Sequence, residues 1–590
     1  MAVAQQRRAT TASLPAPIGG WNARDSLAAM NPLDAVQMVN FFPTPTDVTL
    51  RQGYSKSSIG ITGAVLSLMS YSSPTTTKLF AATATIIYDA STSTATSSLT
   101  GNTDGKWIHS MITTAGGSFM PAVNGVDPMV VYDGTRWSRS ATTSTAQTIS
   151  TITRGGTGNL TATLTTAVAH GLVTGNTITV AGAIPAEFNG TFRITVTGAT
   201  TLTYTMATAP SGDASTVGTY TINYFITGLN SNTFAYVNLF KERLYFVEEN
   251  SLNFWYLPVD SINGAVTKFP LGGIFKNGGY LQAMGTWTID AGYGVDDLAV
   301  FVTSNGEVAV YKGSNPSDPT DWALIGLWNI GQSFARKCVF KYGGDILLLT
   351  QQGLVPLSAG LQSTRLDPRV NITDKIFYAI SQAADLYSAN FGWQISYFAK
   401  YNMLILNVPV TGGIEQYVMH NITKSWARFT DIQAYAWESS GDDMYFGGDG
   451  FVGKFYDTFA DAGTNITASV QQAYSYFDTQ GQQKRFTMVR PILQTFNGVP
   501  TVLCGISTDF ETVDLTSQIS FNPAILQTGE WDMDNWDNCN WGGGQLATTK
   551  VWQGVTGIGY AASISLNVAS QNIEFHWAST DFVMERGGIL

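Results

Sequence analysis

The segment DDLAVFVTSNGEVAVYKGS, residues 296–314, shows the pattern that recurs most clearly along this chain. An apolar run from Leu298 to Val302 is followed by Asn305-Gly306 and by a second apolar run that ends at Tyr311. Two runs rich in Val, Phe and Tyr that flank an Asn-Gly pair predict two antiparallel strands joined by a tight turn. The segment therefore predicts a β-hairpin.

Six other segments share this pattern of strand, Gly/Asn/Asp turn and second strand. They are TKLFAATATIIYDAS from Thr77, SFMPAVNGVDPMVVYDGTRW from Ser118, ERLYFVEENSLNFWYL from Glu242, GDILLLTQQGLVPLSAG from Gly344, YNMLILNVPVTGGIEQYVMHNITKSWARF from Tyr401 and DDMYFGGDGFVGKFYD from Asp442. Equivalent positions in the seven units lie 40 to 56 residues apart, except for one interval of 126 residues; they are Leu79, Phe119, Tyr245, Ala299, Leu347, Met403 and Met444. A four-stranded propeller blade has about 40 to 50 residues. We therefore expect an all-β chain with a β-propeller of six to eight blades over residues 61–140 and 226–464.

The long interval contains a region of different composition, residues 141–225. It is rich in Thr, Gly, Ala and Val and has only four charged residues, which are Arg154, Glu187, Arg193 and Asp213. Removing these 85 residues leaves an interval of 41, again the length of one blade. Apolar residues alternate along its strands, as at Ile178 and Val180, which predicts a small inserted β-sandwich or barrel.

The two ends of the chain differ from the propeller pattern. After about Thr464 the hairpin units stop, and strands such as PTVLCGIST and NIEFHWAS predict a C-terminal β-sandwich over residues 465–590. Residues 1–60 are expected to form an N-terminal segment with a short helix that packs on the propeller. That helix is predicted over residues 31–42, with Asn31 as its N-cap and Pro32 at its first position. A second helix is predicted over residues 373–387, capped by Thr373, with one face made of Ile376, Phe377, Ile380, Ala384 and Tyr387.

The composition supports a β-rich, multidomain protein. At 590 residues the chain exceeds one compact core, since domains average roughly 150 residues. Charged residues make up 12%, about half the usual share, and aromatic residues also make up 12%. The aromatic content excludes disorder, and the scarcity of Glu, Lys and Arg argues against a mainly helical protein.

The charge and cysteine content exclude several classes of protein. The formal net charge is −11, which disfavours tight DNA binding because phosphate neutralisation needs a basic surface. Cys338, Cys504 and Cys539 are too few and too scattered for a disulfide framework. The N-terminus lacks the apolar core of a secretory signal, and no apolar run is long enough to predict a membrane-spanning segment.

No known catalytic or metal-binding motif occurs in the sequence. The four histidines, His109, His170, His420 and His576, lie in different segments, and HExxH, CxxC, GxSxG and phosphate-loop motifs are absent. We therefore predict no catalytic, cofactor-binding or metal-binding residues, no cofactor and no enzymatic activity.

Two groups of acidic residues remain as weaker alternatives. Asp532, Asp534, Asp537 and Asn538 offer oxygen ligands for calcium without the Gly and Glu of an EF-hand, so an ordered loop packed by Trp531, Trp536 and Trp541 is favoured. Glycoside hydrolysis needs two carboxyl groups about 5 to 10 Å apart. Candidate pairs are Asp296-Asp297, Asp442-Asp443, Glu248-Glu249 and Asp509 with Glu511.

Three regions together resemble the tail nozzle proteins of short-tailed bacteriophages, also called tail tubular protein B or packaged-DNA stabilisation proteins. In residues 17–54 the resemblance lies in Gly19, Gly20 and Asn22, in Asn40-Phe41, and in Arg51, Gly53 and Tyr54. Residues 334–358 are similar to a central blade of that family, with Gly343-Gly344-Asp345 before a strand and Gly353 after it. At the end, WQGVTGIG from Trp552 and the residues Phe575, Trp577, Phe582 and Glu585 resemble the C-terminal sandwich.

The resemblance implies a structural virion protein in the phage tail, assembled in the host cytoplasm. Such subunits form a ring, typically a homo-hexamer, below a head-to-tail adaptor, and genomic DNA passes through the ring without tight binding. The Gly-rich segment LGGIFKNGGY, residues 271–280, is a candidate gate for genome retention and ejection, with a plain inter-blade turn as the alternative. The nearly uncharged insert would face outward, toward tail fibres or spikes.

A second function stays open. A carbohydrate-binding or depolymerising tail protein that acts on host surface polysaccharide would need aromatic side chains clustered beside converging carboxylates. Trp531, Trp536 and Trp541, near Asp532 and Asp537, are the local group that fits this requirement.

Overall fold

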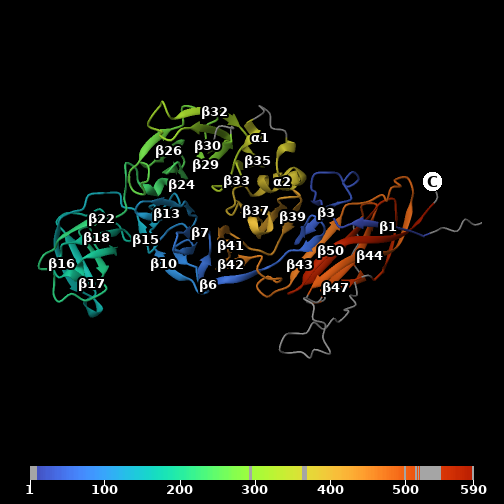
Figure 1. Cartoon of the computed structure of the whole chain (residues 1–590), viewed down its shortest axis with the longest axis horizontal. Helices are drawn as coiled ribbons and strands as arrows, with labels where there is room; N and C mark the ends of the chain where they lie inside the picture. The colour runs from blue at the N-terminus through green and yellow to red at the C-terminus, as the bar shows by residue number, and fades with distance from the viewer. Residues whose placement is uncertain are drawn as a thin grey trace, which may run out of the picture.

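The computed structural model describes residues 9–290, 295–361, 368–496, 498, 500–511, 515, 517–518, 546–549 and 551–587. The chain is all-β, and Figure 1 shows a propeller in the middle, a small domain on one side and a two-sheet body on the other. No helix in the described ranges is both long and apolar enough to span a membrane.

The described residues form seven propeller blades around one axis. The first blade contains β7 (Ser67–Ser72), β8 (Thr77–Ala82), β9 (Ile86–Asp89) and β10 (Thr96–Thr100). The second contains β11 (Ile108–His109), β12 (Ile112–Thr114), β13 (Gly117–Val123), β14 (Val130–Tyr132) and β15 (Trp137–Arg139). The third contains β24 (Phe234–Phe240), β25 (Arg243–Glu248), β26 (Asn253–Tyr256) and β28 (Thr267–Pro270). A short parallel pair, β23 (Ile226–Thr227) with β27 (Gly264–Ala265), forms a separate two-stranded sheet.

The other four blades follow after residue 280. They are β29 (Leu281–Asp290), β30 (Val295–Thr303), β31 (Glu307–Lys312) and β32 (Ala323–Asn329); β33 (Val339–Tyr342), β34 (Asp345–Thr350) and β35 (Gly353–Pro356); β36 (Gln394–Phe398), β37 (Met403–Val410), β38 (Gly413–His420) and β39 (Trp426–Phe429); and β40 (Ala436–Ser440), β41 (Asp443–Gly447) and β42 (Asp449–Phe455) with β6 (Tyr54–Ala64). Each of the seven hairpin units predicted from the sequence contains the strand that pairs with the innermost strand of one blade.

The first strand of each blade lies next to the axis and contacts its neighbour around the ring. The contacts run in the order β7, β11, β24, β29, β33, β36 and β40, and β40 contacts β7 again. The last blade also contains β6, which precedes the first blade in the sequence and pairs with β42. Strands from both ends of the propeller segment thus join in one sheet, and this pairing closes the ring.

The insert consists of two sheets with a common core. One sheet contains β16 (Ile149–Gly155), β17 (Thr161–Thr166), β20 (Thr195–Val196) and β21 (Thr201–Thr205), and the other contains β18 (Thr177–Ala181), β19 (Gly190–Arg193) and β22 (Thr219–Ile222). Its ends meet at a bridge between Ala141 and Phe225, and its side chains reach back to the propeller, as where Arg193 donates to the Ser98 carbonyl at 2.8 Å. The polypeptide therefore leaves and re-enters the propeller at one place.

The C-terminal body shares a sheet with the propeller. The ten-stranded sheet runs from β36 through β39 to β2 (Gly20–Trp21), β3 (Asp34–Val39), β43 (Ile466–Gln472), β49 (Ala562–Ser570), β45 (Thr501–Thr508) and β46 (Ser517–Gln518). A seven-stranded sheet packs on it and contains β1 (Ala9–Pro15), β4 (Phe41–Pro43), β5 (Val48–Leu50), β44 (Lys484–Phe496), β47 (Leu546–Thr549), β48 (Gln553–Gly559) and β50 (Glu574–Arg586). One apolar core that includes Phe41, Leu566 and Trp577 joins the two sheets.

The first 60 residues are placed differently from the prediction. They do not form a separate segment: β2 and β3 pair with β39 of the sixth blade and continue its sheet into the C-terminal body, β1, β4 and β5 belong to the seven-stranded sheet, and β6 belongs to the last blade. The predicted helix over residues 31–42 is wrong: Asp34–Val39 is strand β3, which lies between β2 and β43. Pairing on both sides overrides the local helical signals, and β-branched Val36 and Val39 suit a strand.

The second predicted helix is present, with a different start. A 3₁₀ turn, η5 (Asp374–Ile376), leads into α2 (Phe377–Tyr387), whose Ile380 and Ala384 are buried. Thr373 does not cap it, because its Oγ1 accepts the Leu354 backbone N–H at 3.1 Å instead. The other described helical turns are α1 (Leu357–Leu361), η1 (Thr157–Asn159), η2 (Ala186–Phe188), η3 (Ser231–Thr233), η4 (Pro368–Val370) and η6 (Ala399–Tyr401).

A buried ion pair lies where the propeller meets the C-terminal sheets. Arg51 is 0% exposed and Asp461 6% exposed, and the two Nη atoms of Arg51 donate to the two Asp461 oxygens at 2.8 and 2.6 Å. The Arg51 Nε donates to Asn40 Oδ1 at 2.9 Å, and the Nη atoms also reach the Gln52 and Thr430 carbonyls. Every donor of this guanidinium therefore has an acceptor, as burial of a charge requires. We call Asn40, Arg51, Thr430 and Asp461 the joint.

Candidate functional site at the propeller axis

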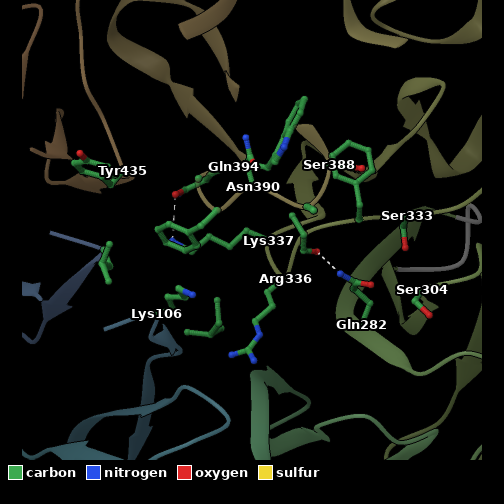
Figure 2. A pocket seen from close by; sticks show the side chains of 18 of the residues that line it. Lys106, Gln282, Ser304, Ser333, Arg336, Lys337, Ser388, Asn390, Gln394 and Tyr435 are labelled. Atoms are coloured by element: carbon green, nitrogen blue, oxygen red, sulfur yellow. Dashed lines mark hydrogen bonds between the residues drawn. The ribbon is translucent and has the colours of Figure 1, made fainter. Parts of the chain in front are cut away.

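A cavity of about 540 Å³ opens at one end of the propeller axis. The innermost strands β7, β11, β29, β33, β36 and β40 begin there, and the loops before them form the wall together with the turn between β30 and β31. Figure 2 shows side chains from these loops around one space, among them Lys106, Gln282, Arg336, Lys337 and Gln394. We call this cavity the axial pocket, because it draws its lining from blades on opposite sides of the ring.

The loop before β33 crosses this end of the axis. In this segment, Ser333 Oγ donates to the Thr303 carbonyl at 2.8 Å, and the Ala335 carbonyl accepts from Gln282 Nε2 at 2.7 Å. Ala335 has a φ of 67°, a left-handed conformation that is uncommon for a residue with a side chain. The bonds made by Ser333 and by the Ala335 carbonyl hold the loop in that conformation and direct the next two side chains toward other blades.

Arg336 ties the loop to two blades. Its Nη1 donates to the Asn124 carbonyl at 2.5 Å, and its Nη2 pairs with Glu249 Oε2 at 2.8 Å. Asn124 follows β13 and Glu249 follows β25, so this one side chain links the second and third blades to the fifth. The arrangement makes Arg336 a structural link across the pocket.

Lys337 lies deeper, where the axial pocket meets a second cavity of about 410 Å³. Its Nζ donates to Gln394 Oε1 at 3.2 Å. The Gln394 amide is itself fixed, because its Oε1 also accepts the Trp437 N–H and its Nε2 donates to the Trp437 carbonyl. Burial lowers the pKa of the Lys337 ammonium, and the charge of Glu438 opposes that shift.

Lys106 supplies a second ammonium without a carboxylate partner. Its Nζ lies 5.2 Å from the centre of the Phe391 ring, and no ion pair involving it is found within the described ranges. Asp104 is the one carboxylate among the residues that line the axial pocket, and its Oδ1 accepts the backbone N–H of Lys106 at 3.0 Å. The lining therefore carries more positive than negative charge, although the chain as a whole is acidic.

The rest of the axial pocket combines exposed aromatic rings with neutral polar groups. Tyr280 and Phe391 are each 41% exposed and belong to loops before the fourth and sixth blades. The hydroxyl and amide side chains of the lining are Gln282, Ser304, Asn305, Gln332, Ser333, Ser388, Asn390 and Gln394. This combination suits a small polar ligand with an apolar face.

The four histidines lie in separate places. His109 lies in the second cavity, with Nε2 3.6 Å from Glu438 Oε1. His170 Nδ1 accepts the Leu172 N–H, and His420 contacts Thr423. His576 lies between two carboxylates, 2.7 Å from Asp47 and 3.0 Å from Glu574. Within the described ranges, no group of three or more His, Cys, Asp or Glu is placed to hold a metal ion.

Several of the acidic residues considered for catalysis have structural partners. Glu248 accepts from Asn253 and Trp255, and Glu249 pairs with Arg336. Asp443 pairs with Lys454 and lies near Lys400.

Two more of these carboxylates, Asp297 and Asp509, also accept hydrogen bonds. Asp297 accepts from Thr288, and Asp509 accepts the Tyr560 and Ala561 N–H groups. Cys338 and Cys504 are buried free thiols, and burial raises the pKa of Cys338 to about 12. The predicted calcium and tryptophan loop, residues 531–541 with Cys539, lies outside the described residues.

The Gly-rich segment 271–280 connects the third and fourth blades. The backbone N–H groups of Lys276 and Asn277 donate to the Glu307 carboxylate, and Tyr280 reaches the axial pocket. The segment is an inter-blade connection whose last residue contributes to the pocket; whether it also gates a passage stays a prediction.

Sequence reasoning missed the axial pocket because its residues come from seven separate segments of the chain. The one local signal is Arg336-Lys337, two adjacent cations just before a strand with a buried Cys338. Adjacent cations usually mark a solvated surface, so the pair did not point to the axis of a propeller.

Comparison with known proteins found no family and only weak structural likenesses. No protein-family model matches the chain, and no curated protein matches it. Solved structures that resemble it include YCF48 from Cyanidioschyzon merolae, with 11% identity over 70% of this chain and 97% of that chain and a TM-score of 0.23. The Swd1 β-propeller domain of Myceliophteria thermophila has 7% identity over 69% of this chain and all of that domain, with a TM-score of 0.27.

A 6-phosphogluconolactonase-like protein from Bacteroides uniformis has 10% identity over 62% of this chain and 91% of that one, with a TM-score of 0.25. These neighbours have different functions, and their low scores transfer none of those functions to this chain. The chain is, by its own strand order and the ring of contacts between its blades, a β-propeller protein.

Proposed function

We propose that this chain is a structural subunit of the ring-shaped nozzle of a short phage tail, located in the virion and assembled in the host cytoplasm. In this proposal six copies enclose a passage that retains the genome and later conducts it during ejection. The partners are a head-to-tail adaptor, tail fibres or spikes, and genomic DNA that passes without tight binding.

The observation that carries the proposal is the position of the residues that resemble the nozzle family. Asn40, Arg51 and Gly53 come from the resembling N-terminal segment, and all three lie at the joint or against it. Their side chains and close backbone contacts hold the propeller and the C-terminal sheets as one body. A subunit that resists force from a moving genome benefits from such a sealed connection.

The axial pocket is too small to serve as the passage for the genome. The loop before β33 crosses the axis, and the axial pocket is a small-molecule-sized cavity of about 540 Å³. Duplex DNA has a major groove that alone is about 12 Å wide, so it does not fit such a cavity. The proposed conduit is therefore enclosed between neighbouring subunits.

The charge of the chain fits a conduit. Six copies at −11 carry a formal charge of −66, and acidic residues on a wall repel phosphates over a Debye length of about 8 to 10 Å. Weak attachment is what a conduit needs, because each Lys or Arg contact to phosphate adds a salt-sensitive hold on the strand.

Imaging tests this proposal directly. We expect electron microscopy of the purified chain, alone and with the adaptor, to show six-fold rings, and antibody labelling to mark the tail of the virion. Deleting residues 141–225 is a suitable control, because Ala141 and Phe225 already meet and the propeller can be rejoined there. The deletion should preserve the ring and remove only contacts made by the insert; a chain that stays monomeric with the adaptor and is absent from tails contradicts the proposal.

The carbohydrate-depolymerising alternative has less support in the described residues. Hydrolysis of a glycosidic bond uses two carboxyl groups, and the axial pocket has Asp104 alone among its lining residues. Incubation with capsular polysaccharide and measurement of new reducing ends tests this alternative.

A further inference from the structure

We propose that the axial pocket binds a saccharide that carries a carboxylate, such as a uronic acid unit. This inference does not depend on the nozzle proposal, because it rests on the lining of one cavity within one chain. Three features of that lining point to this ligand: two lysines without carboxylate partners, two exposed aromatic rings, and a set of hydroxyl and amide groups.

The lysines call for an anion. Lys106 Nζ contacts the Phe391 ring, and Lys337 Nζ has the neutral Gln394 oxygen within hydrogen-bond distance. Neither forms an ion pair with a carboxylate in the part of the chain that the structure describes, although acidic residues outnumber basic ones by 42 to 31. A carboxylate entering a partly dehydrated cavity would interact with both ammonium groups more strongly than it would at the open surface.

The aromatic rings call for a ligand with an apolar face. Tyr280 and Phe391 are each 41% exposed and line the same pocket from different blades. Aromatic rings that line a pocket beside polar groups offer an apolar surface that a ligand can cover. The C–H face of a pyranose ring covers an aromatic ring in this way, whereas inorganic phosphate or a short dicarboxylate does not.

The neutral polar groups and the size of the pocket complete the argument. Serine hydroxyls and Asn or Gln amides both donate and accept hydrogen bonds, which matches the hydroxyl groups of a sugar. A volume of about 540 Å³ is in the range of small-ligand pockets and would hold about one or two sugar rings. With one carboxylate in the lining, the pocket is equipped to bind a glycan and not to cleave it.

Calorimetry of the full chain with digalacturonate, and with its methyl ester as the uncharged counterpart, tests the proposal. We expect saturable binding of digalacturonate that weakens as salt is raised, and at least about tenfold weaker binding of the ester, since charge-assisted hydrogen bonds contribute about this much. Lys106→Gln should weaken binding of the acid about tenfold and leave binding of the ester unchanged. Phe391→Ala should weaken both.

Lys400→Gln is the matched control, because Lys400 is an exposed lysine outside the axial pocket and should leave both affinities unchanged. Unfolding midpoints equal to wild type would show that the variants are folded. The proposal is overturned if digalacturonate does not bind at millimolar concentration, or if Lys106→Gln binds it as wild type does. It is also overturned if inorganic phosphate competes as well as the saccharide while Phe391→Ala has no effect, which would indicate a plain anion site.

Discussion

The joint and the axial pocket both contain basic side chains away from the outer surface, but the hydrogen-bond partners of those side chains differ. At the joint, Arg51 is 0% exposed and each of its donors has a protein acceptor. At the axial pocket, the described partner of Lys337 is the neutral Gln394 oxygen, and that of Lys106 is the Phe391 ring.

The completeness of its hydrogen bonds distinguishes a structural cation from a cation available to a ligand. Burying a charge is costly unless it is paired and hydrogen-bonded, so the complete set of bonds around Arg51 is what permits its burial. A cation with an incomplete set persists where water reaches it, and water can be exchanged for a ligand. The joint should therefore govern stability, and the axial pocket should govern binding.

Removing Arg51 should have the largest effect. Arg51→Met leaves Asp461 buried without its partner, and loss of one member of a buried pair costs about 3 to 5 kcal/mol of unfolding free energy. Urea denaturation followed by intrinsic fluorescence measures this loss. The double variant Arg51→Met with Asp461→Leu should recover much of it, because an apolar replacement of both members removes the unpaired charge; a single variant as stable as wild type would contradict the role of the joint.

Gly53→Ala should have the next largest effect. A Cβ at this position would collide with the Ala460 carbonyl and approach the Asp461 carboxylate, so the chain beside the ion pair would have to move. Overpacking of this kind costs about 1 to 3 kcal/mol. Gly481→Ala is the matched control, because no atom lies near its added Cβ, and equal unfolding midpoints for the two variants would refute the close approach.

His576 is an intermediate case, half-buried between Asp47 and Glu574. The hydrogen bond to Asp47 raises the pKa of His576, and burial opposes the shift. Because the folded pKa is raised, the stabilisation is full below about pH 6.5 and is lost as pH rises through the folded pKa.

The stability difference between wild type and His576→Gln should therefore shrink as pH rises above about 6.5, and it should stay below about 1 kcal/mol because the group is partly exposed. Unfolding midpoints across this pH range measure it. The pKa of Asp47 is lowered, since hydrogen bonds from His576 and Thr44 outweigh the effect of burial, so a second loss is expected as pH falls through the folded pKa of Asp47. A difference that grows with rising pH would contradict the assignment.

Lys106→Gln should have the smallest effect on stability. Its ammonium has no ion pair within the described ranges, so we expect a change within about 0.5 kcal/mol. Thermal unfolding without ligand measures it. A loss as large as that of Arg51→Met would show that Lys106 is a structural cation, and the contrast between the two regions would fail.

Much of the architecture could be predicted from the sequence because it depends on local patterns. Each hairpin unit, such as residues 296–314, contains its own strand alternation and turn, so a propeller of six to eight blades and the position of the insert follow from spacing. The helix predicted over residues 31–42 failed because strand β3 obtains its structure from β2 and β43, which are distant in the sequence.

The sequence by itself determined that the chain is all-β, built of repeated hairpins, acidic and without a known catalytic motif. Only the tertiary structure decided that β6 closes the ring, that Arg51 meets Asp461 across 410 positions, and that Lys106, Lys337 and Phe391 share one pocket. The physical reason is that alternation and turn chemistry act over a few neighbouring residues, whereas ring closure and the axial pocket depend on pairings between blades. Those pairings have no period that a single sequence displays.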